Sequence, residues 1–292
     1  MKLVIGSHVS FTSSKQLLGS LNEALSYNAN TFMLYTGSTQ STKRGVIDEK
    51  ITLKAHELMK ENEIDPKNVI VHAPYIINFA NRSDEDKYNF YINFFTEELN
   101  RCNALGLDKI VLHPGSATTC TKEEGIKNIA YALNKVFKNT PYTNVLLEFM
   151  AGKGNEIGSS IDELKAIIDL IEDKSRIYVC LDTCHMNDAG IDLNYFDEFL
   201  NEFDKKIGIN KIKCIHINDS KNVVGAHKDR HDNIGYGTIS FDTLLNIIYN
   251  ERIDCPRILE TPYINRGEKD ATSPYKQEIE MIRNKKFIDF IQ

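Results

Sequence analysis

Residues 109–113 read KIVLH, a short apolar run that stops abruptly at a histidine. The same event occurs at seven other places, where a β-branched or leucine-rich run ends on a polar residue. The eight end residues are His8, Tyr35, His72, His113, Glu148, Asp182, His216 and Glu260. Successive end residues lie 27, 37, 41, 35, 34, 34 and 44 positions apart. Each interval is long enough for a loop, a helix of about 12 residues and a return loop.

The intervals between these runs are typical of amphipathic helices. Segments such as 16–28 (QLLGSLNEALSYN) and 125–138 (GIKNIAYALNKVFK) carry apolar residues at spacings of three and four. Three intervals also contain the Ser/Thr-x-x-Asp/Glu pattern that begins many helices. These pairs are Ser83 with Asp86, Thr121 with Glu124, and Ser160 with Glu163.

Alternating strands and helices predict a parallel sheet, and continuously apolar strands predict burial on both faces. Eight such units in 292 residues predict a single α/β domain over residues 1–292, folded as a (β/α)8 TIM barrel. An open doubly wound sheet is the competing fold. It is disfavoured because no glycine-rich G-x-G-x-x-G turn follows the first strand.

Bulk composition narrows the class of protein. The 41% hydrophobic and 26% charged residues are typical of a globular chain with ample core. No apolar run is long enough for a transmembrane helix, and MKLVIGSHVS turns polar too early for a signal peptide. The 6 cysteines form no C-x-x-C pair, so we expect reduced thiols in a cytoplasmic protein. The net charge of −6 argues against a protein that coats nucleic acid with a basic surface.

Six successive strand ends carry residues that bind metals. They are His72, His113, Glu148, Asp182, His216 and Glu260. In a TIM barrel these residues would line one arc at the C-terminal ends of the strands, where active sites of this fold lie. Crowded carboxylates repel one another unless cations are bound. Mixed imidazole and carboxylate ligands suit Zn2+, with Mn2+ or Fe as substitutes, and six ligands exceed the needs of one ion.

The stretch HINDSKNVVGAHKDRHDNIGYG, residues 216–237, adds further ligands. If it is extended at KDRHDN, Asp229 and His231 lie on one side and Arg230 points away. His185, in LDTCH, is placed to join them and form an open three-ligand site. Three neighbours are less specific. His227 and Asp232 read as surface or outer residues, and Asp219 as a residue that orients a ligand or caps the next turn.

Clustered divalent ions indicate a substrate class. Three such ions would make the carboxylate-rich mouth net positive, so an acidic chain could still hold an anion there. Neighbouring ions activate water and stabilise an attacked phosphate together with its leaving oxygen. The sequence therefore favours hydrolysis of a phosphodiester.

The chain resembles the endonuclease IV family of zinc-dependent apurinic/apyrimidinic endonucleases over nearly its whole length. The segments that carry the resemblance are VLHPGS, LEFMAGKG, LDTCH, HINDSK, KDRHDNIGYG and LETPY, in family order. The resemblance implies three zinc ions per chain, with Glu148 bridging the first two. It assigns His72 and His113 to the first ion, Asp182, His216 and Glu260 to the second, and His185, Asp229 and His231 to the third.

The resemblance also implies a reaction and a partner. The implied reaction is hydrolysis of the phosphodiester 5′ to an abasic site in duplex DNA, leaving a 3′-hydroxyl and a 5′-deoxyribose phosphate, and removal of blocked 3′ ends. A metal-bridging hydroxide would attack, with Glu148 and Glu260 as the catalytic carboxylates and Glu260 orienting the nucleophile. The implied enzyme acts in base-excision repair, and we expect a monomer.

DNA contacts are implied for two loops. Tyr75 and Ile76, in HAPYIINFA, match a loop that the family inserts into DNA, and Gln40, Lys43 and Arg44 match a loop that enters the minor groove. Two features depart from the family pattern: GSHVSFTSSK near the N-terminus lacks a glycine pair that some relatives carry, and Phe149 stands in LEFMAGKG where Thr or Asn is usual. A side chain next to a ligand on a strand points to the opposite face, so we expect ligation to be unaffected. His8 has no assigned role.

Two rival functions remain at this point. A divalent-metal sugar isomerase or epimerase can use a similar barrel, but it gives no reason for His185, Asp229 and His231. A non-catalytic protein that binds DNA lesions could keep the fold. The presence of all nine expected ligands counts against loss of catalysis.

Overall fold

A closed barrel of eight parallel strands forms the centre of the computed structural model, which describes residues 3–39 and 41–291. Around the barrel the strands follow the order β1-β10-β7-β6-β5-β4-β3-β2. Their bounds are β1 Ile5–Val9, β2 Thr31–Leu34, β3 Ile70–His72, β4 Lys109–Leu112, β5 Asn144–Glu148, β6 Ile177–Asp182, β7 Ile212–Ile217 and β10 Arg257–Leu259. The predicted (β/α)8 barrel is confirmed.

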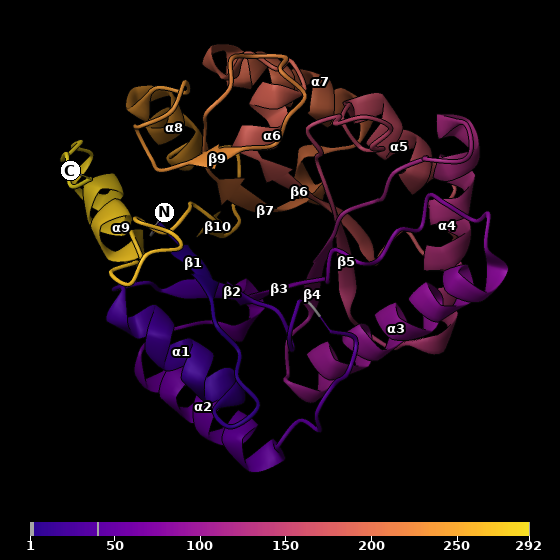
Figure 1. The fold of residues 1–292 in the computed structure, drawn as a ribbon, viewed down its shortest axis with the longest axis horizontal. Coiled ribbons are helices and arrows are strands. Elements are labelled where there is room, and N and C mark those ends of the chain that lie inside the picture. Colours follow the sequence, from indigo (N-terminus) through magenta and orange to yellow (C-terminus); the bar gives the residue numbers. More distant parts are fainter. Residues whose placement is uncertain (1–2, 40, 292) are drawn as a thin grey trace.

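Helices surround the barrel on its outer side (Figure 1). They are α1 Gln16–Ser26, α2 Glu49–Glu61, α3 Glu85–Ala104, α4 Lys122–Asn139, α5 Ile161–Asp169, α6 Thr183–Asp188, α7 Phe196–Lys206, α8 Phe241–Ile248 and α9 Tyr275–Asn284. Short 3-10 turns lie at Pro66–Asn68, Leu193–Tyr195 and Ile209–Lys211. Within the described ranges, the helices lack the combination of length and apolar character that crossing a membrane requires.

The helix starts follow local capping chemistry, with one difference from expectation. Thr121 and Glu124 form the reciprocal capping box that the sequence predicts for α4. Ser160 caps α5 by accepting a hydrogen bond from the backbone N–H of Glu163. The predicted cap at Ser83 is wrong, because α3 begins one residue later and Asp84 accepts from its first turn instead.

The barrel interior is filled by one apolar layer, and this layer explains where the polar side chains lie. It consists of Met33, Ile70, Val111, Leu146, Cys180, Cys214 and Ile258. Side chains two positions apart on a strand face the same way. The next inward-facing positions are Tyr35, His72, His113, Glu148, Asp182, His216 and Glu260. The polar strand ends therefore form a layer directly above the apolar one.

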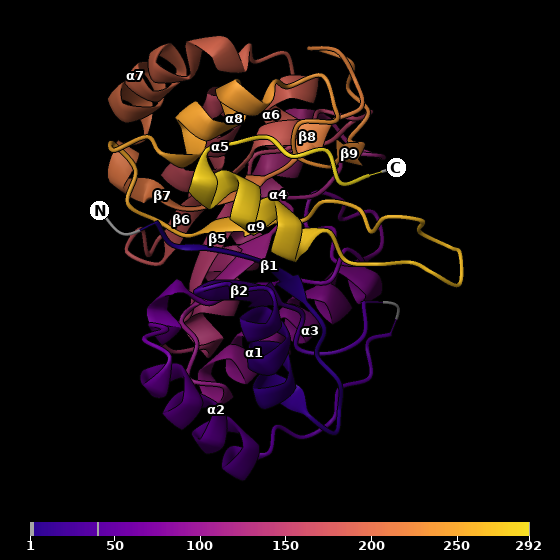
Figure 2. The same cartoon turned by 90° about the vertical axis from the view of Figure 1, so that its left-hand side faces the viewer.

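A small ribbon and a projecting loop rise above the carboxyl ends of the strands. Strands β8 (Asp219–Ser220) and β9 (His231–Asp232) pair antiparallel. In Figure 2, β9 and the loop that precedes α9 lie on the side toward which β1 runs. The long connections of the barrel thus gather around the polar layer.

Candidate metal centre

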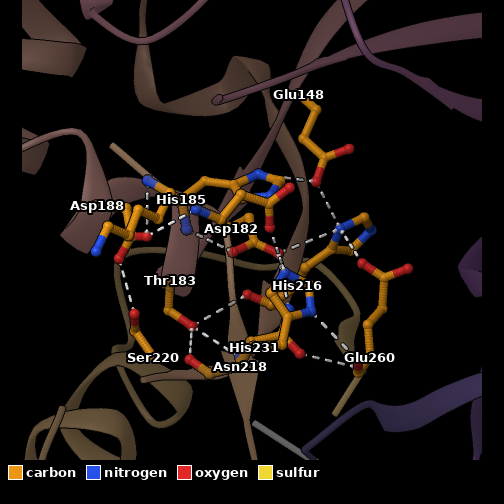
Figure 3. Close-up of polar contacts among 12 residues, drawn as sticks. Glu148, Asp182, Thr183, His185, Asp188, His216, Asn218, Ser220, His231 and Glu260 are labelled. Carbon is orange, nitrogen blue, oxygen red and sulfur yellow. Dashed lines mark hydrogen bonds and ion pairs between the residues drawn. The ribbon is translucent and has the colours of Figure 1, made fainter. Parts of the chain in front are cut away.

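Glu148, at the end of β5, is the central carboxylate of the polar layer (Figure 3). Its Oε2 lies 3.3 Å from Nε2 of His72 and 2.9 Å from Nε2 of His113. Its Oε1 lies 3.0 Å from Nδ1 of His216 and 3.4 Å from Nδ1 of His185. The side chain is 1% exposed. One buried carboxylate therefore faces histidines from four different segments of the chain.

A second group forms around His216 on β7. Its Nδ1 lies 2.9 Å from Oε2 of Glu260 and 3.7 Å from Oδ2 of Asp182. The ligand atoms of Glu148, Asp182, His216 and Glu260 all lie within 4.8 Å of one another, as do those of His72, His113 and Glu148. The structure thus brings together all six ligand-capable strand ends and gives Glu148 a place in both groups.

The third group combines α6 with the loop before β9. Oδ1 of Asp229 lies 3.2 Å from Nε2 of His185 and 3.4 Å from Nε2 of His231. The proximity of these side chains was predicted, but the predicted geometry is wrong. Asp229 has a positive φ of 58° rather than an extended backbone, and Arg230 lines the same cleft instead of pointing away from it. A turn, not strand alternation, brings Asp229 to the two histidines.

Backbone carbonyls orient three of the histidines. Nδ1 of His72 is 2.7 Å from the carbonyl oxygen of Ala73, Nδ1 of His185 is 3.0 Å from that of Phe149, and Nδ1 of His231 is 3.2 Å from that of Glu260. When Nδ1–H donates to a carbonyl, the lone pair of Nε2 is left for a metal. Nε2 of each of these rings faces a carboxylate, and Nδ1 of His185 also lies 3.4 Å from Oε1 of Glu148.

One histidine nitrogen supports the fit to metal ions. Nε2 of His231 is buried and has no hydrogen-bond partner among the described residues. An unpaired buried nitrogen is unfavourable unless something binds it. The carboxylates and imidazoles around it are the donor set that zinc accepts. Nε2 of His216 is likewise buried and unpaired, whereas its Nδ1 faces the carboxylates.

The charges of the site stabilise one another even without cations. Burial raises the pKa of the Glu148 carboxyl, but His113 and His216 outweigh burial and hold this pKa well below its usual value. Glu260 behaves in the same way, because burial is outweighed by His216 and the pKa is lowered. Burial lowers the pKa of His185, but the carboxylates of Asp182, Asp229 and Glu148 raise it well above its usual value. The layer is therefore an array of opposite charges.

Two cysteine-containing groups also lie near the histidines. Cys184 is within 4.8 Å of ligand atoms of Asp229 and His231, and Cys180 and Cys214 are equally near His216. Burial raises the pKa of Cys184 far above its usual value, and that of Cys180 as well. Burial also acts to raise the pKa of Cys214, but hydrogen bonds to Cys180 and His216 outweigh it and lower this pKa to about 6. Buried neutral thiols are poor metal ligands because the thiolate is the binding form. His185 is thus the better third partner for Asp229 and His231.

Asn218 is a residue of the site that the sequence did not indicate. Its Nδ2 donates to Oδ2 of Asp182 at 2.7 Å, and its Oδ1 accepts from the backbone N–H of Glu260 at 3.1 Å. Asn218 follows His216 by two positions, immediately beyond the end of β7, so the spacing within HIND was the available signal. One amide links the ends of two strands that supply carboxylates.

The residues expected to touch DNA have different positions. Tyr75 and Ile76 are 57% and 46% exposed, and the ring of Tyr75 lies 5.0 Å from that of His113. Lys43 is exposed, whereas the side chain of Arg44 is only 1% exposed and its Nε lies 2.5 Å from Oε1 of Glu98. This burial does not favour a phosphate contact by Arg44. Gln40 lies outside the described residues.

The structure also shows where four further residues lie for which the sequence analysis gave an expectation. Phe149 is buried and its ring packs edge-on against Phe199 at 5.8 Å, on the side away from the ligands. Asp219 accepts hydrogen bonds from the backbone N–H groups of Ser220, Gly235, Gly237 and Ile239, so it holds the later turn at residues 235–239. His227 is exposed, with Nδ1 3.0 Å from the carbonyl oxygen of Ala151, and Asp232 is half-buried.

An open cleft of about 930 Å³ lies over the metal-ligand layer. Its floor includes His113, Glu148, His185, Asp229, His231 and Glu260. Its walls carry cations and aromatic rings from the surrounding loops. They include Lys221, Arg230, Arg266, Tyr75, Tyr236 and Tyr263. A cleft with an anion-binding wall and a ligand-rich floor suits a phosphate-containing polymer.

Comparison with known proteins first shows the fold class of the chain. Residues 21–285 match the family described as xylose isomerase-like TIM barrel. The structure is similar to the crystal structure of endonuclease IV from Thermus thermophilus, with a TM-score of 0.81, 23% identity and coverage of 96% of this chain and 97% of that chain. At that identity, the likeness shows the fold.

Sequence relatives are more specific. The chain is 49% identical to the probable endonuclease 4 of Acholeplasma laidlawii, over 98% of this chain and 96% of the relative. It is 47% identical to the probable endonuclease 4 of Staphylococcus saprophyticus, with the same coverage. The chain belongs to the endonuclease IV family, as its motifs predicted.

Proposed function

We propose that this protein is a zinc-dependent endonuclease that hydrolyses the phosphodiester 5′ to abasic sites in duplex DNA. The products would be a 3′-hydroxyl and a 5′-deoxyribose phosphate, as base-excision repair requires, and blocked 3′ ends would be further substrates. The observation that carries this proposal is the position of Glu148 between two pairs of histidines in a buried layer. Relatives named probable endonuclease 4 supply the reaction type.

The proposed centre holds three zinc ions. His72, His113 and Glu148 would hold the first, and Glu148, Asp182, His216 and Glu260 the second. His185, Asp229 and His231 would hold the third, in agreement with the distances from Asp229. Mn2+ or Fe would be accepted by the same donors. Bound ions of this kind supply Lewis-acid activation of water and of phosphoryl oxygens.

The chain's own groups position the reactants. Glu260 is ionised, because its pKa is lowered, and its side chain is 12% exposed at the cleft. It would accept a hydrogen bond from the attacking water and so orient a lone pair toward phosphorus. Asn218 holds the backbone of Glu260 and thereby fixes the direction of this carboxylate. Glu148 would hold the ligand array together.

The exposed side chains at the cleft edge suit recognition of a missing base. Tyr75 and Ile76 would fill the gap in the base stack while the abasic sugar turns toward the metal centre. Lys43 would contact backbone phosphate. A minor-groove contact by Gln40 stays a prediction, and Arg44 is left out of the proposed contacts because Glu98 holds its guanidinium.

The test uses a duplex with one tetrahydrofuran abasic analogue and protein whose metal content has been determined. The analogue cannot undergo β-elimination, so a cut on its 5′ side requires hydrolysis. Cleavage with about three zinc ions per chain supports the proposal. An intact strand from fully loaded protein overturns it: tight binding without cleavage would indicate a lesion-binding protein, and ketose turnover would indicate an isomerase or epimerase.

A further inference from the structure

We propose that Asp188 is a positioning residue that sets the backbone of residues 227–229 and thereby holds Asp229 in the metal centre. This inference rests on the proposed function, because it concerns the third zinc site. Asp188 is the last residue of α6, three positions after His185. One short helix therefore carries both a ligand and the anchor of a second ligand.

The buried carboxylate of Asp188 accepts hydrogen bonds on both oxygens. Oδ2 accepts from the backbone N–H of Asp229 at 2.8 Å, from that of Lys228 at 3.3 Å and from Nδ2 of Asn222 at 2.9 Å. Oδ1 accepts from the hydroxyl of Ser220 at 2.7 Å, a contact drawn in Figure 3, and from Nδ2 of the neighbouring Asn187 at 3.1 Å. Asp188 itself is 0% exposed. Four of these five partners belong to the segment between β7 and β9, and only Asn187 belongs to α6 itself.

The backbone around these donors adopts conformations that need support. His227 and Asp229 have φ values of 53° and 58°, in the left-handed region that is unfavourable for residues other than glycine. Successive N–H groups in such a turn form a concave anion-binding nest. The N–H groups of Lys228 and Asp229 line this nest, and the Asp188 carboxylate fills it. The N–H of His227 donates to the Asp188 carbonyl at 2.9 Å.

The nest explains how an irregular loop places a ligand accurately. The turn directs Oδ1 of Asp229 to within 3.2 Å of His185 and 3.4 Å of His231. Without the carboxylate in the nest, two backbone N–H groups would lose their acceptor and the left-handed turn would relax. The carboxylate of Asp188 is not itself a candidate ligand, because the metal-holding groups among the described residues do not include it.

The test is Asp188→Asn with a zinc count at fixed free zinc. The amide keeps the shape but replaces one acceptor oxygen by an NH2 group, which opposes the backbone N–H donors. Loss of a partner that orients a metal ligand weakens binding by about 10- to 100-fold. We expect one of three ions to dissociate first, as in Asp229→Ala, while the other two stay bound. Normal affinity for all three ions in Asp188→Asn would overturn the inference.

Asp219→Asn is the matched control. Asp219 is also 0% exposed and also accepts several backbone N–H bonds. Three of its four donors, Gly235, Gly237 and Ile239, lie outside the turn at 227–229 that places Asp229. It should lose thermal stability without selective loss of one ion. If Asp219→Asn and Asp188→Asn lose the same ion equally, the role of Asp188 is merely structural and the inference fails.

Two further measurements keep the result decisive. If Asp188→Asn does not fold, Ser220→Ala offers a second test, because it removes one hydrogen-bond donor to the Asp188 carboxylate. This substitution should also lower the zinc affinity of the third site. Unchanged affinity in that variant would count against the inference. Wild-type protein reports separately on the proposed function: fewer than three ions or no cleavage there refutes the nuclease proposal, whatever Asp188 does.

Discussion

Nδ1 of His216 lies 3.0 Å from Oε1 of Glu148, although the two residues are 68 positions apart in the chain. Both side chains are at most 1% exposed. Burying a charge is costly unless an opposite charge or a cation compensates it. The apolar layer below them and the open cleft above them leave this pair at the boundary where substrate and ions enter.

Glu148→Gln should remove metal binding more severely than loss of any one histidine, because Glu148 contributes to two of the proposed ion sites. We expect activity on abasic DNA to fall by at least about 100-fold, since even an outer partner of a ligand is worth that much. Zinc content and cleavage rate should fall together. The proposal of a shared carboxylate is refuted if Glu148→Gln retains three ions at unchanged affinity.

Chelation should lower thermal stability and activity together. Each site adds about 4 kcal/mol when free zinc exceeds Kd by about 1,000-fold. Melting curves with and without a strong chelator measure this difference, and restored zinc should restore both properties. A melting temperature that does not change on chelation would show that the ligand layer does not bind ions tightly.

Tyr75→Ala should weaken binding to abasic duplex by about 1–3 kcal/mol, the usual contribution of a stacking aromatic residue. Because Tyr75 is 57% exposed, the melting temperature should hardly change. Tyr195→Ala is the control, since Tyr195 is 61% exposed on the 3-10 turn before α7. Equal effects of the two substitutions on DNA affinity would remove Tyr75 from recognition.

Lys43→Ala and Arg44→Ala should differ in kind. Loss of the exposed Lys43 should weaken binding at low salt and reduce the salt slope by about 1. Loss of Arg44 leaves the buried Glu98 without one of its cationic partners and should lower the free energy of unfolding by about 3–5 kcal/mol. DNA titrations at several salt concentrations and urea unfolding separate the two. A stable Arg44→Ala variant with a reduced salt slope would restore Arg44 as a phosphate contact.

Glu278 should make stability depend on pH. Burial raises the pKa of its carboxyl from 4.5 to about 7, although Thr261 and the N–H of Ile234 donate to it. Because the pKa of Glu278 is higher in the folded than in the unfolded state, its protonated carboxyl contributes fully to stability below pH 4.5. This contribution is lost as the pH rises to about 7. The loss is on the order of 3 kcal/mol. Urea unfolding of zinc-saturated wild type and Glu278→Gln measures it as a difference.

In that experiment the effect of pH on zinc binding is common to both proteins, so it cancels. Glu278→Gln should therefore gain stability relative to wild type as the pH rises from about 5 to about 8. A constant difference across this range would show that Glu278 titrates normally.

Strand ends were predictable because strand alternation is local. Leu146 and Cys214 face the barrel interior, so the residues two positions later, Glu148 and His216, face it as well. This relationship can be read from the sequence alone. The barrel then brings these positions to one mouth. The composition of the ligand layer followed from this regularity, whereas the family followed from the sequence motifs around these positions.

The remaining features depend on contacts between distant segments. Arg44 reads as a surface cation beside Lys43, but Glu98 and Phe94 of α3 cover it, and α3 is far away in the sequence. Asp229 reads as part of an extended segment, but Asp188 on α6 supports a left-handed turn there. No local pattern distinguishes these alternatives, because the deciding partner lies 41 positions away for Asp229 and 54 for Arg44.

The apolar layer and the ligand layer close only when β10 pairs with both β1 and β7. Glu260, which follows β10, is the last ligand to be synthesised. A chain still emerging from the ribosome thus holds His72 and His113 without the final carboxylate or a finished barrel. We expect the ions to bind after the chain has left the ribosome. A chain with all its metal ions would then be fully folded, and a chain with fewer ions would be truncated or misfolded.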